Sequence, residues 1–226
     1  MPERLAFPFQ TPRAWAVADR LVARAGGVPM RCLVCGRLSL ARIEGSNLRE
    51  SGRCVRCGAS NRQRQVAAVI LSGLGPPRCR SLAQLATASG ATIYNTEAQR
   101  AIHDTLSASA GYRCSEYLSP DVPGGAMVDG AEHQDLCALT YDHRECLDRT
   151  RARRRPDGTV EHLAEPEYHI DPVRPDGALV YTDFGLEMLV RLRRLGFGVR
   201  VHHMHRTGHG ILGNNALVFE ATALAR

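Results

Sequence analysis

The chain has 226 residues, of which 44% are hydrophobic and 23% charged, a composition typical of a globular protein with one medium domain and a small satellite. Its net charge is +6, and all 29 basic residues are arginines mixed among 23 acids, which favours a solvated surface over a nucleic-acid groove. No apolar run approaches the roughly 20 residues of a membrane helix, and MPERLAFPFQ lacks the regions of a secretion signal, so we expect a cytoplasmic protein without a membrane partner.

Residues 1–27 are expected to form a helical lead-in, because TPRAWAVADRLVARAGG has a Thr-Pro start and a Gly-Gly stop. One side of this helix carries the larger apolar residues, Trp15, Val17, Leu21 and Val22. Residues 28–77 follow as a cysteine-rich ribbon and a linker helix. The pattern NRQRQVAAVILSGLG predicts that helix over residues 61–75, before Pro76 and Pro77.

Residues 78–226 alternate between strand and helix patterns. Expected strands lie in ATIYNTEA, YRCSEYL, GAMVDG and ALVFEATAL, and an expected helix lies in QRAIHDTLSAS. GALVYTDFGLEMLVRLRRLGFGVRVHHM predicts a long helix after Asp183 and then a strand. This alternation predicts an α/β domain with a partly parallel sheet.

Four of the eight cysteines form a metal-binding pattern. RCLVCG and GRCVRCG contain two C-x2-C pairs separated by eighteen residues, with the cysteines Cys32, Cys35, Cys54 and Cys57. Each pair sits in a tight turn that points two thiolates at one ion, and cytosolic thiols stay reduced. The pattern predicts a closed tetrahedral zinc site, with Zn–S bonds of about 2.3 Å, that stabilises the fold and has no open position for catalysis. Four unrelated cysteines and a redox pair are the alternatives.

The other cysteines and the histidines have no common metal-site spacing. HQDLCALTYDHREC contains a loose set of four, His133, Cys137, His143 and Cys146, and two further cysteines stand apart, Cys79 and Cys114. We interpret these cysteines as small core residues. VRVHHMHRTGHG contains four more histidines, His202, His203, His205 and His209. Strand alternation places His203 and His205 on the same side, and an exposed strand end is favoured there over a second metal site or a general base.

Acidic residues follow three expected strands. Glu97 ends the first strand in IYNTEA, Glu116 ends the second in CSEYL, and Asp135 follows the third in HQDL. In a doubly wound sheet, ligands bind at the carboxyl ends of the strands. A carboxylate after the second strand can accept both hydroxyl hydrogens of a ribose, and a polar residue after the third can bind the exocyclic amine of adenine. The layout suits an adenosyl ligand, although acids also cap the helices that follow strands.

Several segments occur in a specific order from about residue 30 onward: NLRESGRCVRCGASNRQR, IYNTEAQRAIHDTL, YRCSEYL, HQDLCALTY, EHLAEPEYHIDP, GALVYTDFG and LRRLGFGV. In this order they resemble bacterial class I S-adenosylmethionine-dependent methyltransferases with an N-terminal zinc ribbon. The resemblance implies a small zinc ribbon with four cysteine ligands, followed by a truncated Rossmann-like sheet flanked by helices, with zinc and S-adenosylmethionine as cofactors. It also implies a cofactor-binding set: Asn95, Thr96 and Glu97 at the methionine end, Glu116 at the ribose, and Asp135 with Leu136 at the adenine.

The substrate side of the family is represented by PEYHIDP, residues 166–172. This segment resembles the family's Pro-Glu-Tyr-His-Gly-Asp-Pro, with Ile170 in place of the glycine. His169 is the candidate acid or base there, with Tyr168 beside it for orientation.

Two features depart from the family. The loop after the first strand, NTEAQRA, has none of the glycines that let a backbone approach the cofactor closely. After CLD the sequence passes at once to RTRARRRPDGTVEHL, so a block on the order of fifty residues, two strand-helix units, is missing. The sheet is therefore expected to be truncated, with the edge and part of the hydrophobic face of its first strand exposed. We expect the C-terminal strands or a second chain to cover that edge, which predicts a homodimer, and we expect residues 149–155 to be a solvated loop.

The sequence therefore predicts a methyltransferase-like enzyme that uses S-adenosylmethionine and acts on a small molecule, or a descendant repurposed in specialised metabolism. The alternative is a non-catalytic zinc-ribbon protein that binds a protein or nucleic-acid partner. Residues 28–60 contain no Phe, Tyr or Trp for base stacking, which disfavours nucleic acid. A hydrolase or oxidase with a second metal on the C-terminal histidines is the third hypothesis.

Overall fold

A computed structural model describes ten stretches of the chain: residues 12–45, 47–48, 50–88, 90–98, 100–119, 121–134, 138–141, 147–169, 175–213 and 217–224. The expected adenine-binding pair, Asp135 and Leu136, lies outside these stretches. Three members of the loose cysteine and histidine set also lie outside them: Cys137, His143 and Cys146.

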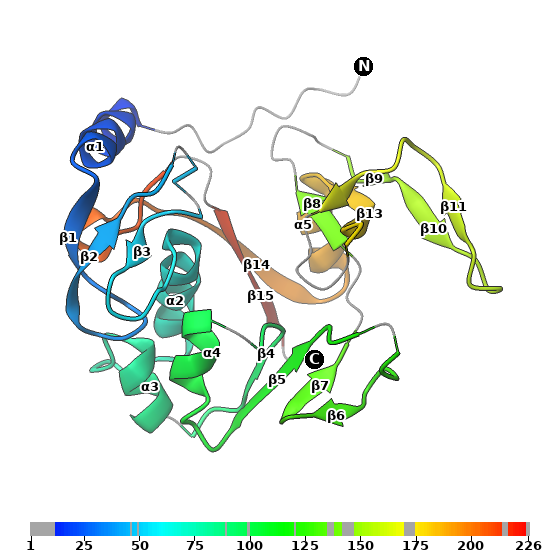
Figure 1. The fold of residues 1–226 in the computed structure, drawn as a ribbon, viewed down its shortest axis with the longest axis horizontal. Coiled ribbons are helices and arrows are strands. Elements are labelled where there is room, and N and C mark those ends of the chain that lie inside the picture. Colours follow the sequence, from blue (N-terminus) through cyan, green and yellow to red (C-terminus); the bar gives the residue numbers. More distant parts are fainter. Residues whose placement is uncertain are drawn as a thin grey trace.

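The chain forms a mixed α/β fold in which helices pack with several small sheets (Figure 1). The helices are α1 (Arg13–Arg24), α2 (Asn61–Leu74), α3 (Leu82–Ala88), α4 (Arg100–Leu106) and α5 (Glu187–Arg194), with a 3-10 turn, η1 (Thr207–His209). The first strands are β1 (Gly27–Arg31), β2 (Leu38–Arg42), β3 (Arg53–Cys54), β4 (Ile93–Asn95), β5 (Tyr112–Glu116), β6 (Met127–Val128), β7 (Ala131–His133) and β8 (Ala138–Tyr141). The later strands are β9 (Arg149–Thr150), β10 (Ala152–Arg154), β11 (Val160–His162), β12 (Tyr168–His169), β13 (Ala178–Phe184), β14 (Phe197–His203) and β15 (Leu217–Ala223). Within the described stretches, no helix is both long and apolar enough to cross a membrane.

The N-terminal half consists of α1, a three-stranded antiparallel sheet in the order β1-β2-β3, and α2. α2 starts with a capping box. The Ser60 hydroxyl accepts a hydrogen bond from the Gln63 amide at 3.3 Å, and the Gln63 side-chain oxygen accepts one from the Ser60 amide at 3.1 Å. The helix ends at Leu74, directly before Gly75 and Pro76, because proline cannot continue a helix. α2 therefore occupies the predicted linker helix.

A second sheet has the order β4-β5-β7-β6, in which β4, β5 and β7 are parallel and β6 is antiparallel to β7. α4 connects β4 to β5, as a crossover between neighbouring parallel strands requires. One face of this sheet buries Tyr112, Cys114 and Ala131 in the same core as Leu85 of α3 and Leu106 of α4. Since the three strands are parallel, their carboxyl ends lie at one edge of the sheet.

The opposite face of this sheet is polar. Tyr94, Arg113 and Glu132 occupy it, because they alternate along their strands with the core residues. The Tyr94 hydroxyl donates a hydrogen bond to Glu132 Oε2 at 2.7 Å and accepts one from Gln134 Nε2 at 2.7 Å. The Tyr94 side chain, from β4, thus crosses the middle strand β5 to reach β7. On the first strand, β4, this face exposes one large side chain, Tyr94, which is 47% exposed and whose hydroxyl group is hydrogen-bonded.

The C-terminal half contains further small sheets. β13 is parallel to β8 and antiparallel to β9 and β12, and β14 and β15 form an antiparallel pair. α5 packs against β14, and α2 packs against β15. In the described part of the chain no strand pairs with the outer edge of β4, so the C-terminal strands do not provide the expected cover.

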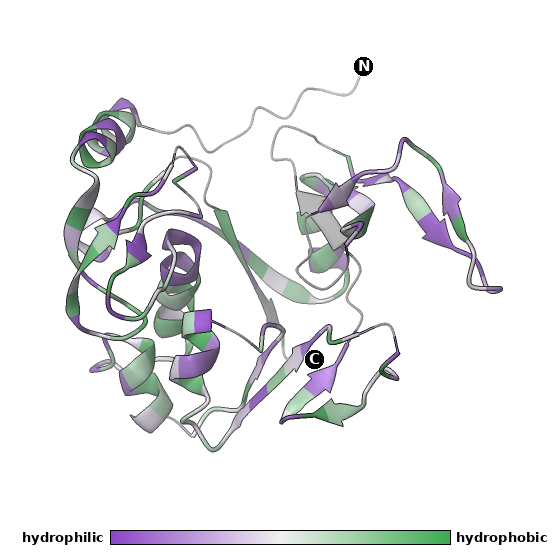
Figure 2. Ribbon diagram, in the orientation of Figure 1, coloured by the Kyte–Doolittle hydropathy of each residue, from purple (hydrophilic) through white to green (hydrophobic). Residues whose placement is uncertain are grey.

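The arginine-rich junction forms strands, and the expected loop is wrong. β9 pairs with β13, and the mostly hydrophilic β10–β11 hairpin extends away from the body (Figures 1 and 2). Between β9 and β10 the Arg151 side chain turns inward, with Nη1 at 2.9 Å from Asp183 Oδ2 and 3.4 Å from Glu167 Oε2. At the hairpin tip, Asp157 Oδ1 accepts a hydrogen bond from the Thr159 amide at 2.9 Å, which fixes the turn.

The capping box of α2 provides a first test of the fold. We expect Ser60→Ala to lower the free energy of unfolding by about 1 kcal/mol, because the Gln63 amide loses a buried acceptor. Ser72→Ala, in the exposed last turn of the same helix, is the matched control and is expected to change it by less than about 0.5 kcal/mol. Urea unfolding of the zinc-saturated proteins measures both changes, and equal effects would contradict the capping role.

Candidate metal centre and strand-end site

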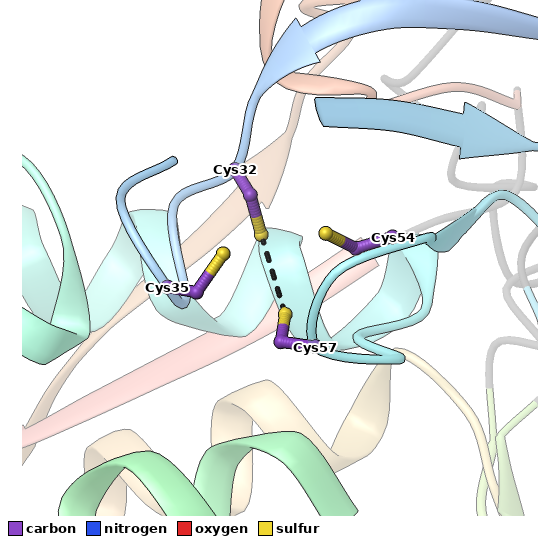
Figure 3. A group of neighbouring side chains, drawn as sticks. All are labelled: Cys32, Cys35, Cys54 and Cys57. Atoms are coloured by element: carbon purple, nitrogen blue, oxygen red, sulfur yellow. Dashed lines mark hydrogen bonds between the residues drawn. The ribbon is translucent and has the colours of Figure 1, made fainter. Parts of the chain in front are cut away.

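The four patterned cysteines converge on one point between the two tight turns (Figure 3). Their Sγ atoms all lie within 4.8 Å of one another, and those of Cys32 and Cys57 are 3.8 Å apart. Tetrahedral zinc with bonds of about 2.3 Å places its sulfur ligands about 3.8 Å apart. Cys32, Cys35, Cys54 and Cys57 could therefore hold a metal ion, and their spacing and chemistry are compatible with zinc.

Each turn is closed by a glycine amide. Gly36 donates to the carbonyl of Cys32, and Gly58 donates to that of Cys54, both at 2.8 Å. The φ angles are +75° at Gly36 and +72° at Gly58, in the left-handed region that glycine adopts without steric cost. A side chain at Gly36 would also lie 2.7 Å from the Ser81 hydroxyl. The glycine in each C-x2-C-G sequence is therefore a requirement of the turn geometry.

Backbone amides inside the turns point at the sulfurs. Cys32 Sγ accepts hydrogen bonds from the amides of Val34 and Cys35, and Cys57 Sγ accepts one from the amide of Ala59. The Cys57 thiol donates to Cys32, which lowers the pKa of the Cys32 thiol to about 5. Such donors favour the thiolate, which is the form that binds metal.

The metal centre is held rigidly by the rest of the fold. Cys32 and Cys54 are fully buried, and the first turn is attached to the start of α3. There the Leu33 carbonyl accepts a hydrogen bond from the Leu82 amide at 2.9 Å. The Val34 carbonyl accepts one from the Ala83 amide at 3.0 Å. With four protein sulfurs available, a bound zinc ion would have no position left for substrate.

Sequence reasoning missed one residue at this centre, Arg64. It lies on the first turn of α2, is 0% exposed, and interacts electrostatically with Cys32, Cys54 and Cys57. A signal was available, because an arginine follows the last cysteine by seven residues at the start of a helix. That spacing alone does not say whether the arginine points inward.

The strand ends form the second candidate site. β4 ends at Asn95, after which come Thr96 and Glu97, and β5 ends at Glu116. Glu116 Oε2 accepts a hydrogen bond from the Ala98 amide at 3.1 Å, so the carboxylate of the second strand holds the loop that follows the first. The structure thus brings the predicted methionine-end residues and the predicted ribose residue together.

The third strand reaches the same edge. The Gln134 amide, directly after β7, donates to the carbonyl of Glu116 at 3.1 Å. This bond places the chain that leads to Asp135 beside the ribose candidate, while Asp135 and Leu136 themselves lie outside the described residues.

The loop between β4 and α4 turns without glycine. Its Glu97 carboxylate contacts Gln63 Nε2 of α2 at 3.5 Å and Arg100 Nε at 3.7 Å. Arg100 has φ +70°, a conformation that an L-residue adopts at a cost of about 1–2 kcal/mol. The loop therefore makes its turn through an arginine with a positive φ angle and not through a glycine. The contact with Gln63 of α2 helps to hold the loop in place.

The predicted catalytic pair lies elsewhere. Tyr168 and His169 form β12, and both side chains are exposed. They pair with Leu179 and Ala178 of β13, in a different sheet from Glu116. The described structure shows no bond that links them to the strand ends.

The C-terminal histidines are structural. Trp15 stacks on His205 at a ring distance of 5.0 Å and meets His203 edge-on at 4.9 Å, so alternation is correct in placing these two together. His205 Nε2 also bonds Asp19 Oδ1 at 2.8 Å. On the opposite side of the strand, His202 Nε2 bonds Glu220 Oε2 of β15 at 2.7 Å. Within the described residues, the only grouping with metal-ligand geometry is the four cysteines.

Only part of the apolar side of α1 faces the body of the protein. Val17 and Leu21 are 47% and 60% exposed. The helix packs through Trp15, Asp19 and Val22 instead, which have helical i, i+4, i+7 spacing. Asp19 was missed because an acid is not expected on a buried face unless a partner such as His205 is known.

Comparison with protein-family models, with curated proteins and with solved structures finds no match to this chain. The function must therefore be argued from two local geometries. One is the closed thiolate centre, and the other is the edge where the ends of β4, β5 and β7 meet.

Removal of one sulfur tests the metal centre. We expect the wild-type chain to bind one zinc ion, and Cys57→Ser to lower its zinc affinity at least ~10-fold because a thiolate is lost from a closed site. Cys79→Ser, which changes a cysteine outside the cluster, is the control and should leave the affinity unchanged. Competition with a chromophoric chelator measures the affinities, and a Cys57→Ser protein that retains wild-type affinity would remove Cys57 from the ligand set.

Proposed function

We propose that the protein is an S-adenosylmethionine-dependent methyltransferase-like enzyme that acts on a small molecule and whose zinc ribbon is structural. One observation carries the proposal: the ends of the neighbouring parallel strands β4 and β5 meet, with the Glu116 carboxylate beside the loop that follows β4. In open parallel sheets joined by crossover helices, this edge is where nucleotide-like ligands bind. On this proposal the small sheets belong to a truncated Rossmann-like domain.

The chemistry of the edge suits an adenosyl ligand. Glu116 Oε2 already accepts the Ala98 amide, and the remaining lone pairs of the carboxylate suit the two ribose hydroxyl groups. Asn95, Thr96 and Glu97 then face the methionine end, where the Glu97 carboxylate favours the positive charges of the sulfonium and amine. Asp135 and Leu136, one and two residues beyond Gln134, take the adenine in this proposal.

The transfer step needs a base on the acceptor side. When bound, S-adenosylmethionine would supply the methyl group, and His169, oriented by Tyr168, would take the proton that the acceptor loses. This assignment requires that the β12–β13 sheet and the strand ends face the same ligand. If they do not, the adenosyl site serves a repurposed enzyme with another step.

A second candidate is a non-catalytic zinc-ribbon protein that binds a protein partner. The observation that favours it is the exposed apolar trio on the ribbon, Leu38, Leu40 and Val55. Val55 and Leu40 are adjacent, since the Val55 amide bonds the Leu40 carbonyl at 3.1 Å. Exposed apolar clusters of this kind mark contact surfaces in soluble proteins.

Ligand titration tests the leading proposal. We expect calorimetry to detect binding of S-adenosylmethionine and of S-adenosylhomocysteine. Glu116→Gln should lower the affinity for both ligands about 10- to 100-fold, since each charged hydrogen bond contributes about 1.5–3 kcal/mol. Glutamine keeps an oxygen for the Ala98 amide, so the loop stays in place. Glu132→Gln, on the opposite face of the neighbouring strand, is the control. Absence of binding to folded, zinc-loaded protein would leave the second candidate.

The open edge of β4 predicts a homodimer. A second chain is the remaining cover for this edge, because the C-terminal strands of the same chain pair with each other. We expect light scattering on the zinc-loaded protein to give twice the 24.7 kDa mass of one chain. A monomer at tens of micromolar concentration would contradict this expectation.

A further inference from the structure

Arg64 joins two parts of the chain that are far apart in sequence. All three of its guanidinium nitrogens donate to backbone carbonyls: Nη1 to Ala59 at 2.6 Å, Nε to His209 at 3.0 Å, and Nη2 to Gly210 at 2.6 Å. Ala59 directly follows the second cysteine turn, whereas His209 and Gly210 belong to the segment after β14. We call residues 206–213 the C-terminal turn. Arg64 thus bridges the metal centre and this turn.

The guanidinium is also the counter-charge of the metal centre. Four thiolates around a divalent zinc ion carry a net charge of roughly −2, and a buried charge is costly unless it is paired. Burial lowers the pKa of Arg64, and the thiolates of Cys32, Cys54 and Cys57 raise it, so the charged guanidinium and the thiolates stabilise one another. A bound ion would also fix the second cysteine turn, and with it the adjacent Ala59 carbonyl that accepts from Arg64 Nη1.

The C-terminal turn fits closely where Arg64 holds it. Gly210 has φ +65°, and a side chain there would lie 2.5 Å from Met30 Sδ and 3.0 Å from Arg64 Nη2. Asn61, on the same turn of α2 as Arg64, bonds Leu212 in both directions, through its amide nitrogen at 2.6 Å and its oxygen at 3.1 Å. Ile211 and Leu212 are fully buried, and Ile211 belongs to the core that contains the cysteines. The turn is therefore part of the ribbon's core.

We propose that Arg64 couples metal loading to the docking of the C-terminal turn, so that a loaded centre holds residues 206–213 against the ribbon and loss of the metal releases them. The coupling is reciprocal. The free energy by which the bound metal stabilises the docked turn equals the free energy by which the docked turn stabilises metal binding. This inference rests on the metal-binding part of the proposed function and is independent of the adenosyl part.

The molecule contains its own reporter of docking. Trp15 is the only tryptophan, and it contacts His203 and His205, which directly precede the C-terminal turn. Asp19, one helical turn further along α1, accepts from His205 Nε2 at 2.8 Å and from the Gly213 amide at 3.1 Å. Release of the turn therefore changes the surroundings of Trp15, and its fluorescence reads docking at a place other than the metal site.

The test uses the full-length chain. We expect removal of zinc by a chelator to shift the emission of Trp15 to longer wavelength and to speed hydrogen exchange in residues 206–213 at least ~10-fold. We expect Arg64→Met to weaken zinc affinity roughly 10- to 100-fold, and to speed exchange in the same residues even at saturating zinc. Arg62→Met removes a neighbouring arginine whose side chain is 40% exposed, and should change neither quantity.

Arg64→Lys covers the case in which Arg64→Met does not fold. Lysine keeps the charge but cannot reach all three carbonyls, so zinc affinity should fall less than ~10-fold while exchange in the turn rises. A chain that binds zinc but shows the same Trp15 emission and exchange with and without it overturns the coupling alone. A chain that binds no zinc overturns the metal centre as well.

Discussion

The convergence of four sulfurs on one point is the constraint on which this structure depends. The side chains that α2 buries beside the centre are mostly polar: Asn61, Gln63, Arg64, Gln65 and Ala67. Each of these polar groups needs a partner when it leaves water. The partners of Asn61 and Arg64 lie in distant parts of the chain as well as next to the second cysteine turn. The ordering of α2 therefore depends on tertiary contacts more than on helix propensity.

The β4-β5-β7 sheet is covered by helices on one face only, and its sequence fits that arrangement. Strands that are covered on both faces are continuously apolar. Here the strands alternate: Ile93 and Cys114 face the core, whereas their neighbours Tyr94 and Arg113 face solvent. Tyr94 crosses the middle strand and covers it with a hydrogen-bonded polar side chain where a helix would otherwise pack. One helix-covered face is enough to hold three parallel strands in register. Their carboxyl ends consequently remain together, which is what the proposed adenosyl site requires.

Local spacing made the cysteine quartet, the extent of α2 and the strand ends predictable, because each depends on residues a few positions apart. Arg64 and Asp19 were not predictable, since their partners lie in the C-terminal turn, more than a hundred residues away. The same reason explains the orientation of α1: Val17 and Leu21 are apolar but exposed, whereas Asp19 faces inward and bonds His205. The junction at residues 149–155 was predicted as a loop because its composition is hydrophilic, whereas β9 pairs with β13 and β10 pairs with β11.

The first turn of α2 is where the separate parts of the molecule meet. Ser60 caps the helix, Asn61 and Arg64 hold the C-terminal turn, and Gln63 closes the capping box while reaching Glu97 at the strand ends. These side chains radiate from a single helical turn, so none can shift without the others. A helical turn is stiff, and the second cysteine turn fixes its start. The loop after β4 is therefore held in part by the helix that follows the second cysteine turn, through the contact between Gln63 and Glu97.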